Sequence, residues 1–310
     1  MLLKFDIEKM IRKEFISSPE KNGKGWSYSF IYYLKDIKNI YIIYYNEKRP
    51  ITVSELLTIC QENNIKSESG KEWTNRNLLE IVNALKNFDL IDVHTNTAKA
   101  GSLFSSNITE LSEEDKRVFQ NIYMRYFRFR DFHQLFDSVN GNPAIVYAFK
   151  EGQRFFNRFA RIDKNEIYYI EDLHQDIMRY WDVYTKWGET LGLLNKCLLS
   201  SFNINLNNPL YKNIYVCNFI RSIPKDFSIC NYIKNKMIGT TYYIPNIEWY
   251  LINEYGFSIE AIKNRILEEC SSKNDSFRLQ KASLLTVNTE DLKLFPTLGN
   301  TYMSHILKIS

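Results

Sequence analysis

The stretch WTNRNLLEIVNALKNFDLIDVHTNTAKAG, residues 73–101, decides how the first third of this chain is expected to fold. Thr74 is a suitable helix N-cap, and apolar residues recur behind it at helical spacing. The predicted apolar face consists of Leu78, Leu79, Ile81, Val82, Leu85 and Phe88. LIDVHT then has the composition of a strand, and NTAKAG supplies a tight turn before a returning strand, SLFSS. The sequence therefore predicts a helix, a strand, a turn and a second strand over residues 73–106.

Two more helical segments are expected before this stretch. ITVSELLTICQENNI has Ser54 as a candidate N-cap, with apolar residues at helical spacing behind it. The aromatic segment 26–47 fits a helix or a mixture of helix and strand. Helix, helix, helix, strand, turn, strand is an order that resembles the winged-helix and helix-turn-helix DNA-binding superfamily. The resemblance covers about residues 26–107 and rests on element order, not on a residue signature.

The resemblance implies which residues would touch DNA. Winged-helix domains place the third helix in the major groove and the turn between the strands beside the backbone. Carried over to this chain, it puts Asn75, Arg76, Asn83 and Lys86 on the exposed face of the third helix, and Lys99 at the tip of the wing. Winged helices also serve as protein-interaction modules, so a protein partner stays open as an alternative.

Two further modules are predicted along the chain. In the first, EIYYIEDLHQDIMRYW and VYTKWGETLGLLNKC are expected as helices, with strands on both sides of NNPL. Its exposed face would hold Lys186, Glu189 and Asn195, with Lys212 near the wing. In the second, two helices are joined by Gly256-Phe257-Ser258, a glycine helix end followed by a serine N-cap. SFRLQKASLL and TYMSHILKI are then expected as strands.

The expected architecture is mostly α with small antiparallel β wings, an α+β fold of tandem winged-helix modules joined by long helices. The predicted divisions are an N-terminal arm (1–25), an N-terminal module (26–110), connecting helices (111–165), a second module (166–220) and a third module (221–310).

A basic segment lies within the predicted connecting helices. FKEGQRFFNRFARI, residues 149–162, is expected to be a helix with Lys150, Arg154, Arg158 and Arg161 on one face and aromatic residues on the other. Its i, i+4 basic pairs repel each other, which favours an acidic partner, either phosphate or acids of the same fold. Arg125 and Arg128 extend this basic character, and residues 116–164 carry ten basic and four acidic residues.

Length and composition place the chain among ordinary globular proteins. It has 310 residues, 45% apolar and 25% charged, with a formal net charge of +4. The five cysteines are dispersed without a CxxC pair, so neither a disulfide framework nor a zinc site is expected. The N-terminus lacks the apolar core of a signal peptide, and the most apolar run, 39–45, is too short to cross a membrane. A cytoplasmic protein without membrane contact is expected.

Catalytic motifs do not support an enzyme. The chain lacks a Walker A loop, GxGxxG, HExxH and GxSxG, and its four histidines are not at metal-ligand spacing, so no metal and no cofactor are expected. Arg128-x4-His133 has the spacing of a HEPN-type ribonuclease motif. Asp275 followed by Asp291-Leu292-Lys293 would suit a metal-dependent nuclease only if the second group lay on a strand.

Three functions follow from these observations. The first is a prokaryotic, non-enzymatic protein that binds duplex DNA as a regulator, replication factor or DNA-recognition subunit of a mobile-element or phage-defence system. The second is a scaffold subunit whose winged helices contact other protein subunits. The third is a cryptic metal-dependent nuclease.

Overall fold

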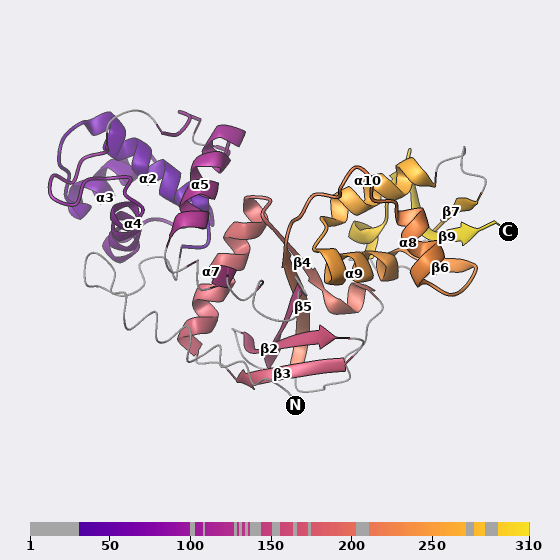
Figure 1. Ribbon diagram of the computed structural model, residues 1–310. Coiled ribbons are helices and arrows are strands. Elements are labelled where there is room, and N and C mark those ends of the chain that lie inside the picture. The colour runs from indigo at the N-terminus through magenta and orange to yellow at the C-terminus, as the bar shows by residue number, and fades with distance from the viewer. Residues whose placement is uncertain are drawn as a thin grey trace. The chain divides into compact units, whose positions relative to one another are not determined.

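The computed structural model of the protein is shown in Figure 1. It describes residues 31–99, 103–107, 109–126, 129, 132–133, 136, 144–150, 156–163, 166–172, 175–202, 211–270, 276–282 and 291–309. Only the backbone is described for 144–150 (apart from Tyr147), 156–163, 166–172, 175–179, 211–213 and 291.

The chain divides into two compact units. The first comprises residues 1–134 and 173–191, and the second comprises 135–172 and 192–310. Within its described residues the first unit is helical, whereas the second holds antiparallel sheets and further helices. An α+β fold with small antiparallel sheets is thus confirmed.

The first unit contains α2 (Leu34–Glu47), α3 (Val53–Glu62), α4 (Asn75–Asn87), α5 (Glu113–Arg125) and α7 (Gln175–Thr190). Helix α3 begins two residues earlier than expected: its N-cap is Thr52, not Ser54. The Thr52 hydroxyl accepts from Glu55 N, and the Glu55 carboxylate accepts from Thr52 N, which forms a capping box. At α4, Thr74 is the N-cap as predicted.

Helix α7 is one continuous helix where two were expected. Residues 166–172 form a strand instead of a helical start, because EIYYI is rich in β-branched and aromatic residues. The helix stops before Gly192, whose φ of 67° is a left-handed conformation that favours glycine. Trp187 of α7 packs edge-to-face on Phe88 and Phe129, and its indole donates to Ile31 O at 2.8 Å. Helix α7 therefore supplies core to the first unit and is not an exposed reading helix.

The second unit begins with a five-stranded antiparallel sheet in the order β3-β2-β1-β5-β4. Its strands are β1 (Ala144–Lys150), β2 (Phe156–Asp163), β3 (Glu166–Asp172), β4 (Leu194–Leu198) and β5 (Tyr211–Phe219). β1 pairs with both β2 and β5, and a bulge interrupts the β1–β2 register between Ala148 and Phe149.

The helix predicted over 149–162 is wrong. Residues 144–150 and 156–163 are paired strands, so the helical geometry that would align the four basic residues on one face does not exist. The sequence does contain a signal for strands here, because two aromatic runs are separated by EGQ and DKNE follows the second run. The four-residue spacing of the arginines obscured this signal. The segment 111–165, predicted as connecting helices, thus includes the helix α5 and the two strands β1 and β2.

The rest of the second unit is a helical layer with a smaller sheet. It contains η1 (Leu199–Phe202), α8 (Ile229–Lys236), α9 (Ile244–Tyr255), α10 (Ile259–Glu269) and η2 (Asp291–Leu294). The sheet has β6 (Thr241–Tyr243), β9 (Thr301–Lys308) and β7 (Phe277–Lys281) in that order, and β8 (Thr297–Leu298) also pairs with β9. Strands near 277 and 301 were predicted, and both are confirmed.

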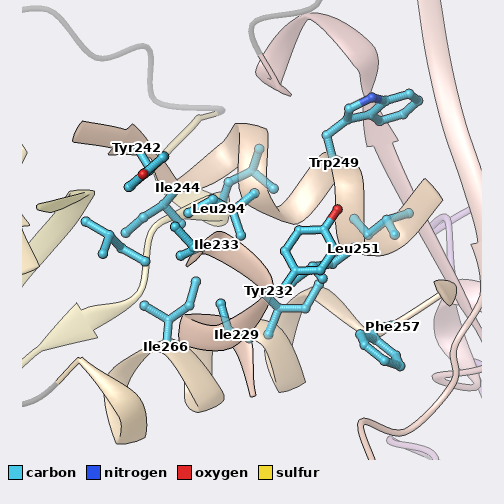
Figure 2. Close-up of a cluster of buried hydrophobic side chains, with 14 of the residues drawn as sticks. Ile229, Tyr232, Ile233, Tyr242, Ile244, Trp249, Leu251, Phe257, Ile266 and Leu294 are labelled. Atoms are coloured by element: carbon cyan, nitrogen blue, oxygen red, sulfur yellow. The ribbon is translucent and has the colours of Figure 1, made fainter. Parts of the chain in front are cut away.

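The core of this part is built from apolar side chains of all three helices and of the sheet. Figure 2 shows Ile229, Tyr232 and Ile233 of α8 among side chains of α9 and α10. The helix-turn-helix punctuation is confirmed, because Gly256 ends α9 with φ 72° and the Ser258 hydroxyl accepts from Ala261 N at the start of α10. Asn218, fully buried on β5, donates to Gly256 O at 3.1 Å and so fixes this turn.

Candidate nucleic-acid interface

Helix α4 is held in the first unit by one apolar side and leaves the opposite side open. Leu78, Ile81, Val82 and Leu85 are buried, and α4 packs against α2 and α3. The Thr74 hydroxyl accepts from Asn77 N at 3.2 Å and closes the first turn. The orientation of the helix is therefore set by its own sequence pattern together with its cap.

The open side of α4 carries the residues that the winged-helix resemblance selected. Asn75 and Arg76 are exposed, while Asn83 and Lys86 are half-buried. Leu79 lies on the same side and is 42% exposed, so its placement in the predicted apolar face is wrong. At 100° per residue Leu79 falls 100° from Leu78, an offset that could have been detected in the sequence.

Most basic side chains of residues 31–99 are neutralised by acids, but those on α4 are not. Within the described residues, the cations that form ion pairs are Lys35, Lys38, Arg49, Lys66 and Lys99. Arg76 and Lys86 form no ion pair with any described residue, and neither do Lys48 and Lys71. Because this segment has nine basic and nine acidic residues, its overall charge is zero. The unpaired basic side chains on α4 are therefore a local positive site, because the segment as a whole has no excess positive charge.

The turn after α4 is shorter than the predicted wing, and Lys99 is not at its tip. Ile91 and Ala98 form an antiparallel bridge, and Lys99 N donates to Leu90 O at 3.1 Å. The chain thus turns at residues 93–96 instead of 96–101. Lys99 lies at the base of this turn, where its Nζ is 2.5 Å from Asp89 Oδ1 just beyond the end of α4. Its role as a tip contact to DNA is not supported.

The turn itself is ordered by Asp92. Its Oδ1 accepts from His94 N at 2.9 Å and from Thr95 N at 2.8 Å. These two backbone donors are the main causes that hold the pKa of Asp92 below its usual value. His94 is exposed and Val93 is 40% exposed, so these residues take the tip position that the sequence assigned to Lys99.

The other predicted DNA contacts are scattered. Arg125 is exposed at the end of α5, and Lys186 is exposed on α7 beside the buried Trp187. Lys150 belongs to β1, and Arg158 and Arg161 belong to β2, with only their backbones described. Arg128 and Arg154 lie outside the described residues. Arg125 and Lys186 thus belong to other helices of the first unit, and Lys150, Arg158 and Arg161 belong to strands of the second unit.

The second module does not have the predicted recognition helix. Asn195 lies on β4, where its Nδ2 donates to Asn218 Oδ1 and Phe257 O, both at 3.2 Å. It serves as an internal link between β4 and the turn before α10. Glu189 is exposed near the end of α7, and Lys212 is in β5 with only its backbone described.

The third module has a helix-turn-helix, but the charges of its second helix are already neutralised. Lys263 is 2.6 Å from Glu260, and Arg265 is 3.5 Å from Glu268 and 4.0 Å from Glu269. With three acidic and two basic residues, α10 is a poor match for a phosphate backbone. The α4 side is therefore the better candidate groove reader of the two.

Of the residues considered for catalysis, His133 is engaged in hydrogen bonds within the first unit. His133 lies with Nδ1 2.8 Å from Tyr184 Oη and Nε2 3.0 Å from Tyr123 O, so both ring nitrogens are engaged. Asp291 and Lys293 are in the 3-10 helix η2, not on the strand that a nuclease core requires, and Asp275 lies outside the described residues. Among the described residues, no group of three or more His, Cys, Asp or Glu side chains is arranged to hold a metal ion.

No helix in the described part of the chain is both long enough and apolar enough to cross a membrane. Comparisons of the chain with models of protein families, with curated proteins and with solved structures find no match.

Proposed function

We propose that the protein binds duplex DNA through its N-terminal module, with α4 in the major groove in the manner of a winged helix. One observation carries this proposal: α4 presents the exposed Arg76 and the half-buried Lys86 without ion-pair partners among the described residues, while most neighbouring cations are neutralised. Arginine and asparagine side chains are the usual donors to guanine and adenine edges, and a lysine adds charge for phosphate.

The position of these donors on the helix suits groove reading. Asn75 and Arg76 are the first two residues of α4, and recognition helices contact base edges with their N-terminal residues. Lys86 is in the last turn, about 15 Å further along the axis at 1.5 Å per residue, within reach of the phosphate backbone. The short wing after α4 supplies a second, ordered contact point at residues 93–96.

Salt dependence of duplex binding tests the proposal. The double variant Arg76→Gln/Lys86→Gln removes two charges from α4, so the slope of log affinity against log salt should become shallower by about 1.8. Lys48→Gln/Lys71→Gln is a matched control, because both lysines are exposed, lie in the same module and are unpaired among the described residues. The control should change the slope by less than half as much. Equal changes in both variants, or none in the α4 variant, would exclude α4 as the DNA contact.

A protein partner is the second candidate function, and exposed apolar residues favour it. Leu79 is 42% exposed in the middle of the α4 side, and Val93 is 40% exposed in the turn. Leu79→Ser should leave duplex affinity within about threefold if this side reads DNA mainly by polar contacts, because a single apolar contact contributes little discrimination. Under the scaffold function the same change would abolish the association of the protein with its partner subunit.

The five cysteines are free thiols, which supports our proposal that the protein works in the reducing cytoplasm.

A further inference from the structure

The small sheet of the second unit has one face in the core and one face turned away from it. Tyr242, Ile306 and Phe277 belong to the buried apolar cluster, and Leu279 packs against that cluster. Since side chains alternate along a strand, their neighbours on β6, β9 and β7 point to the opposite face. In Figure 1 the helices α8, α9 and α10 lie together beside these strands.

The strand register defines two rows across this opposite face. Tyr243 of β6 is paired with His305 of β9, and His305 is paired with Gln280 of β7. The second row, two residues further along, consists of Thr241, Leu307 and Arg278. Thr241, Gln280 and Arg278 are exposed, and Tyr243, His305 and Leu307 are half-buried. We call these six residues the open sheet face.

Two rings of the open sheet face lie side by side. The ring centroids of Tyr243 and His305 are 5.2 Å apart with 46° between the ring planes. The ring centroid of Phe295 lies 5.9 Å from that of Tyr243. His305 Nδ1 is 2.9 Å from Ser304 Oγ, which restrains the imidazole. Burial lowers the pKa of His305, so that its ring is uncharged near neutral pH. The two rings are thus a positioned aromatic surface.

All charged residues of strands β6, β7 and β9 are basic. Strands β6, β7 and β9 carry Arg278, Lys281 and Lys308 and contain no Asp or Glu. All three cations are exposed, but of the three only Arg278 belongs to the open sheet face, since Lys308 is paired with Phe277 on the other face. Arg278 forms no ion pair with the residues that the structure describes. This contrasts with α10 of the same unit, where Lys263 and Arg265 are neutralised by glutamates.

We propose that the open sheet face binds single-stranded nucleic acid, with bases stacking on Tyr243 and His305 and a phosphate held by Arg278. Unpaired bases stack on aromatic side chains of sheet surfaces, while cations follow the backbone. A duplex has its bases stacked inside, so a broad three-stranded face has no access to them. The polar residues Thr241 and Gln280 distinguish this face from an apolar docking surface for a protein. The site is independent of the duplex site on α4.

Fluorescence anisotropy of the full chain with a labelled oligothymidylate of about 12 nucleotides tests this site. An oligouridylate of equal length shows whether the protein prefers single-stranded DNA or RNA as its ligand. Tyr243→Leu and His305→Leu should each weaken binding by roughly tenfold or more, because they remove a stacking ring while keeping an apolar side chain. Tyr243→Phe keeps the ring and should bind like the unmodified protein.

Charge is tested by a matched pair of variants. Arg278→Gln should make the salt slope for a single strand shallower by about 0.7, while Lys225→Gln, which changes another exposed cation of the same unit, should leave it unchanged. Arg76→Ala should not affect single-strand affinity, which separates this site from α4. If Tyr243→Leu fails to fold, photo-cross-linking of halogenated thymidine in the unmodified protein should locate the bases on β6 and β9.

Four results would overturn the proposal: no binding of either single strand, unchanged affinity in folded Tyr243→Leu and His305→Leu, equal slope changes in Arg278→Gln and Lys225→Gln, or cross-links located away from the sheet.

Discussion

Lys38 Nζ lies 2.5 Å from Asp115 Oδ2, and both side chains are completely buried. The remaining donors of Lys38 reach Ser105 Oγ and Glu110 O, both at 2.9 Å, while Asp115 also accepts from Ser105 N and Ser112 N. This network joins α2 to α5 and to the chain between them. A buried ion pair is tolerated only when its hydrogen-bonding capacity is satisfied, and here it is.

Removing one partner of this pair should destabilise the first unit strongly. Asp115→Asn leaves the Lys38 ammonium buried without a counter-charge, at an expected cost of about 3–5 kcal/mol. Glu72→Gln, which breaks the exposed Lys66–Glu72 pair, should cost less than about 1 kcal/mol. Urea denaturation, monitored by hydrogen exchange of the amides of α2 and α5, measures the change in the free energy of unfolding for both variants. A cost for Asp115→Asn as small as that of Glu72→Gln would show that the network contributes little.

The same pair makes the first unit sensitive to acid. Hydrogen bonds from Lys38 and Ser105 outweigh the effect of burial and lower the pKa of Asp115 to about 2. The unfolded chain takes up this proton near pH 4, so the stability that Asp115 contributes is complete above that pH and is lost as pH falls toward 2. The loss should be about 2 kcal/mol between pH 5 and pH 2. An Asp115→Asn variant should lack this part of the acid dependence.

Glu248 should give the second unit the opposite pH dependence. Its side chain on α9 is fully buried, and neither carboxylate oxygen has a hydrogen-bond partner among the described residues. Burial raises its pKa well above the usual value, so the folded protein keeps this carboxyl protonated. The unfolded chain ionises above about pH 4, and stability should therefore fall by up to about 1.4 kcal/mol per pH unit until the folded group also ionises.

Glu248→Gln tests this directly. The variant cannot ionise, so the stability of α9, measured by hydrogen exchange at pH 5 and pH 8, should differ less between the two values than in the unmodified protein. Glu254→Gln on the same helix is a control, because the Glu254 carboxylate accepts from Tyr232 Oη at 3.0 Å and is not isolated. Unmodified protein that is equally stable at both pH values would contradict the assignment of a protonated Glu248.

Arg76 is expected to read a base and not only a phosphate. Arg76→Ala should weaken binding to a preferred duplex sequence by about 1–3 kcal/mol and leave nonspecific affinity nearly intact. Binding titrations on a preferred and a scrambled duplex separate the two effects. Equal losses on both would mean that Arg76 touches only phosphate, and no loss would remove α4 from the DNA-binding proposal.

Thiol labelling should distinguish one cysteine from the other four. Cys60, Cys217, Cys230 and Cys270 are buried, whereas Cys197 is half-buried. The thiols of Cys230 and Cys270 lie 3.6 Å apart, and this contact together with burial raises the pKa of Cys270. Alkylation of the folded protein should modify Cys197 first, and the others only after denaturation. Mass spectrometry of the labelled peptides measures the order, and early labelling of Cys270 would contradict it.

Local signals in the sequence were sufficient for several elements. Thr74 and Ser258 identified the starts of α4 and α10, and Gly256 identified the end of α9, because caps and left-handed glycines act within a few residues of their own position. They were not sufficient for residues 149–162. Arginines four residues apart fit a helix, yet residues 149–150 end strand β1, and pairing with β1 and β3 made residues 156–162 part of strand β2.

The sequence by itself determined the starts of α4 and α10, the end of α9, the α+β class and the choice of Asn75, Arg76, Asn83 and Lys86 as one side of a helix. Only the tertiary structure decided which cations of the first unit remain free, since Lys99 finds Asp89 and Lys38 finds Asp115. It also decided that Tyr243, His305 and Arg278 share one sheet face, although about 60 residues separate Tyr243 from His305. Strand pairing joins residues that are distant along the chain, and the register of that pairing depends on how the whole unit buries its apolar side chains.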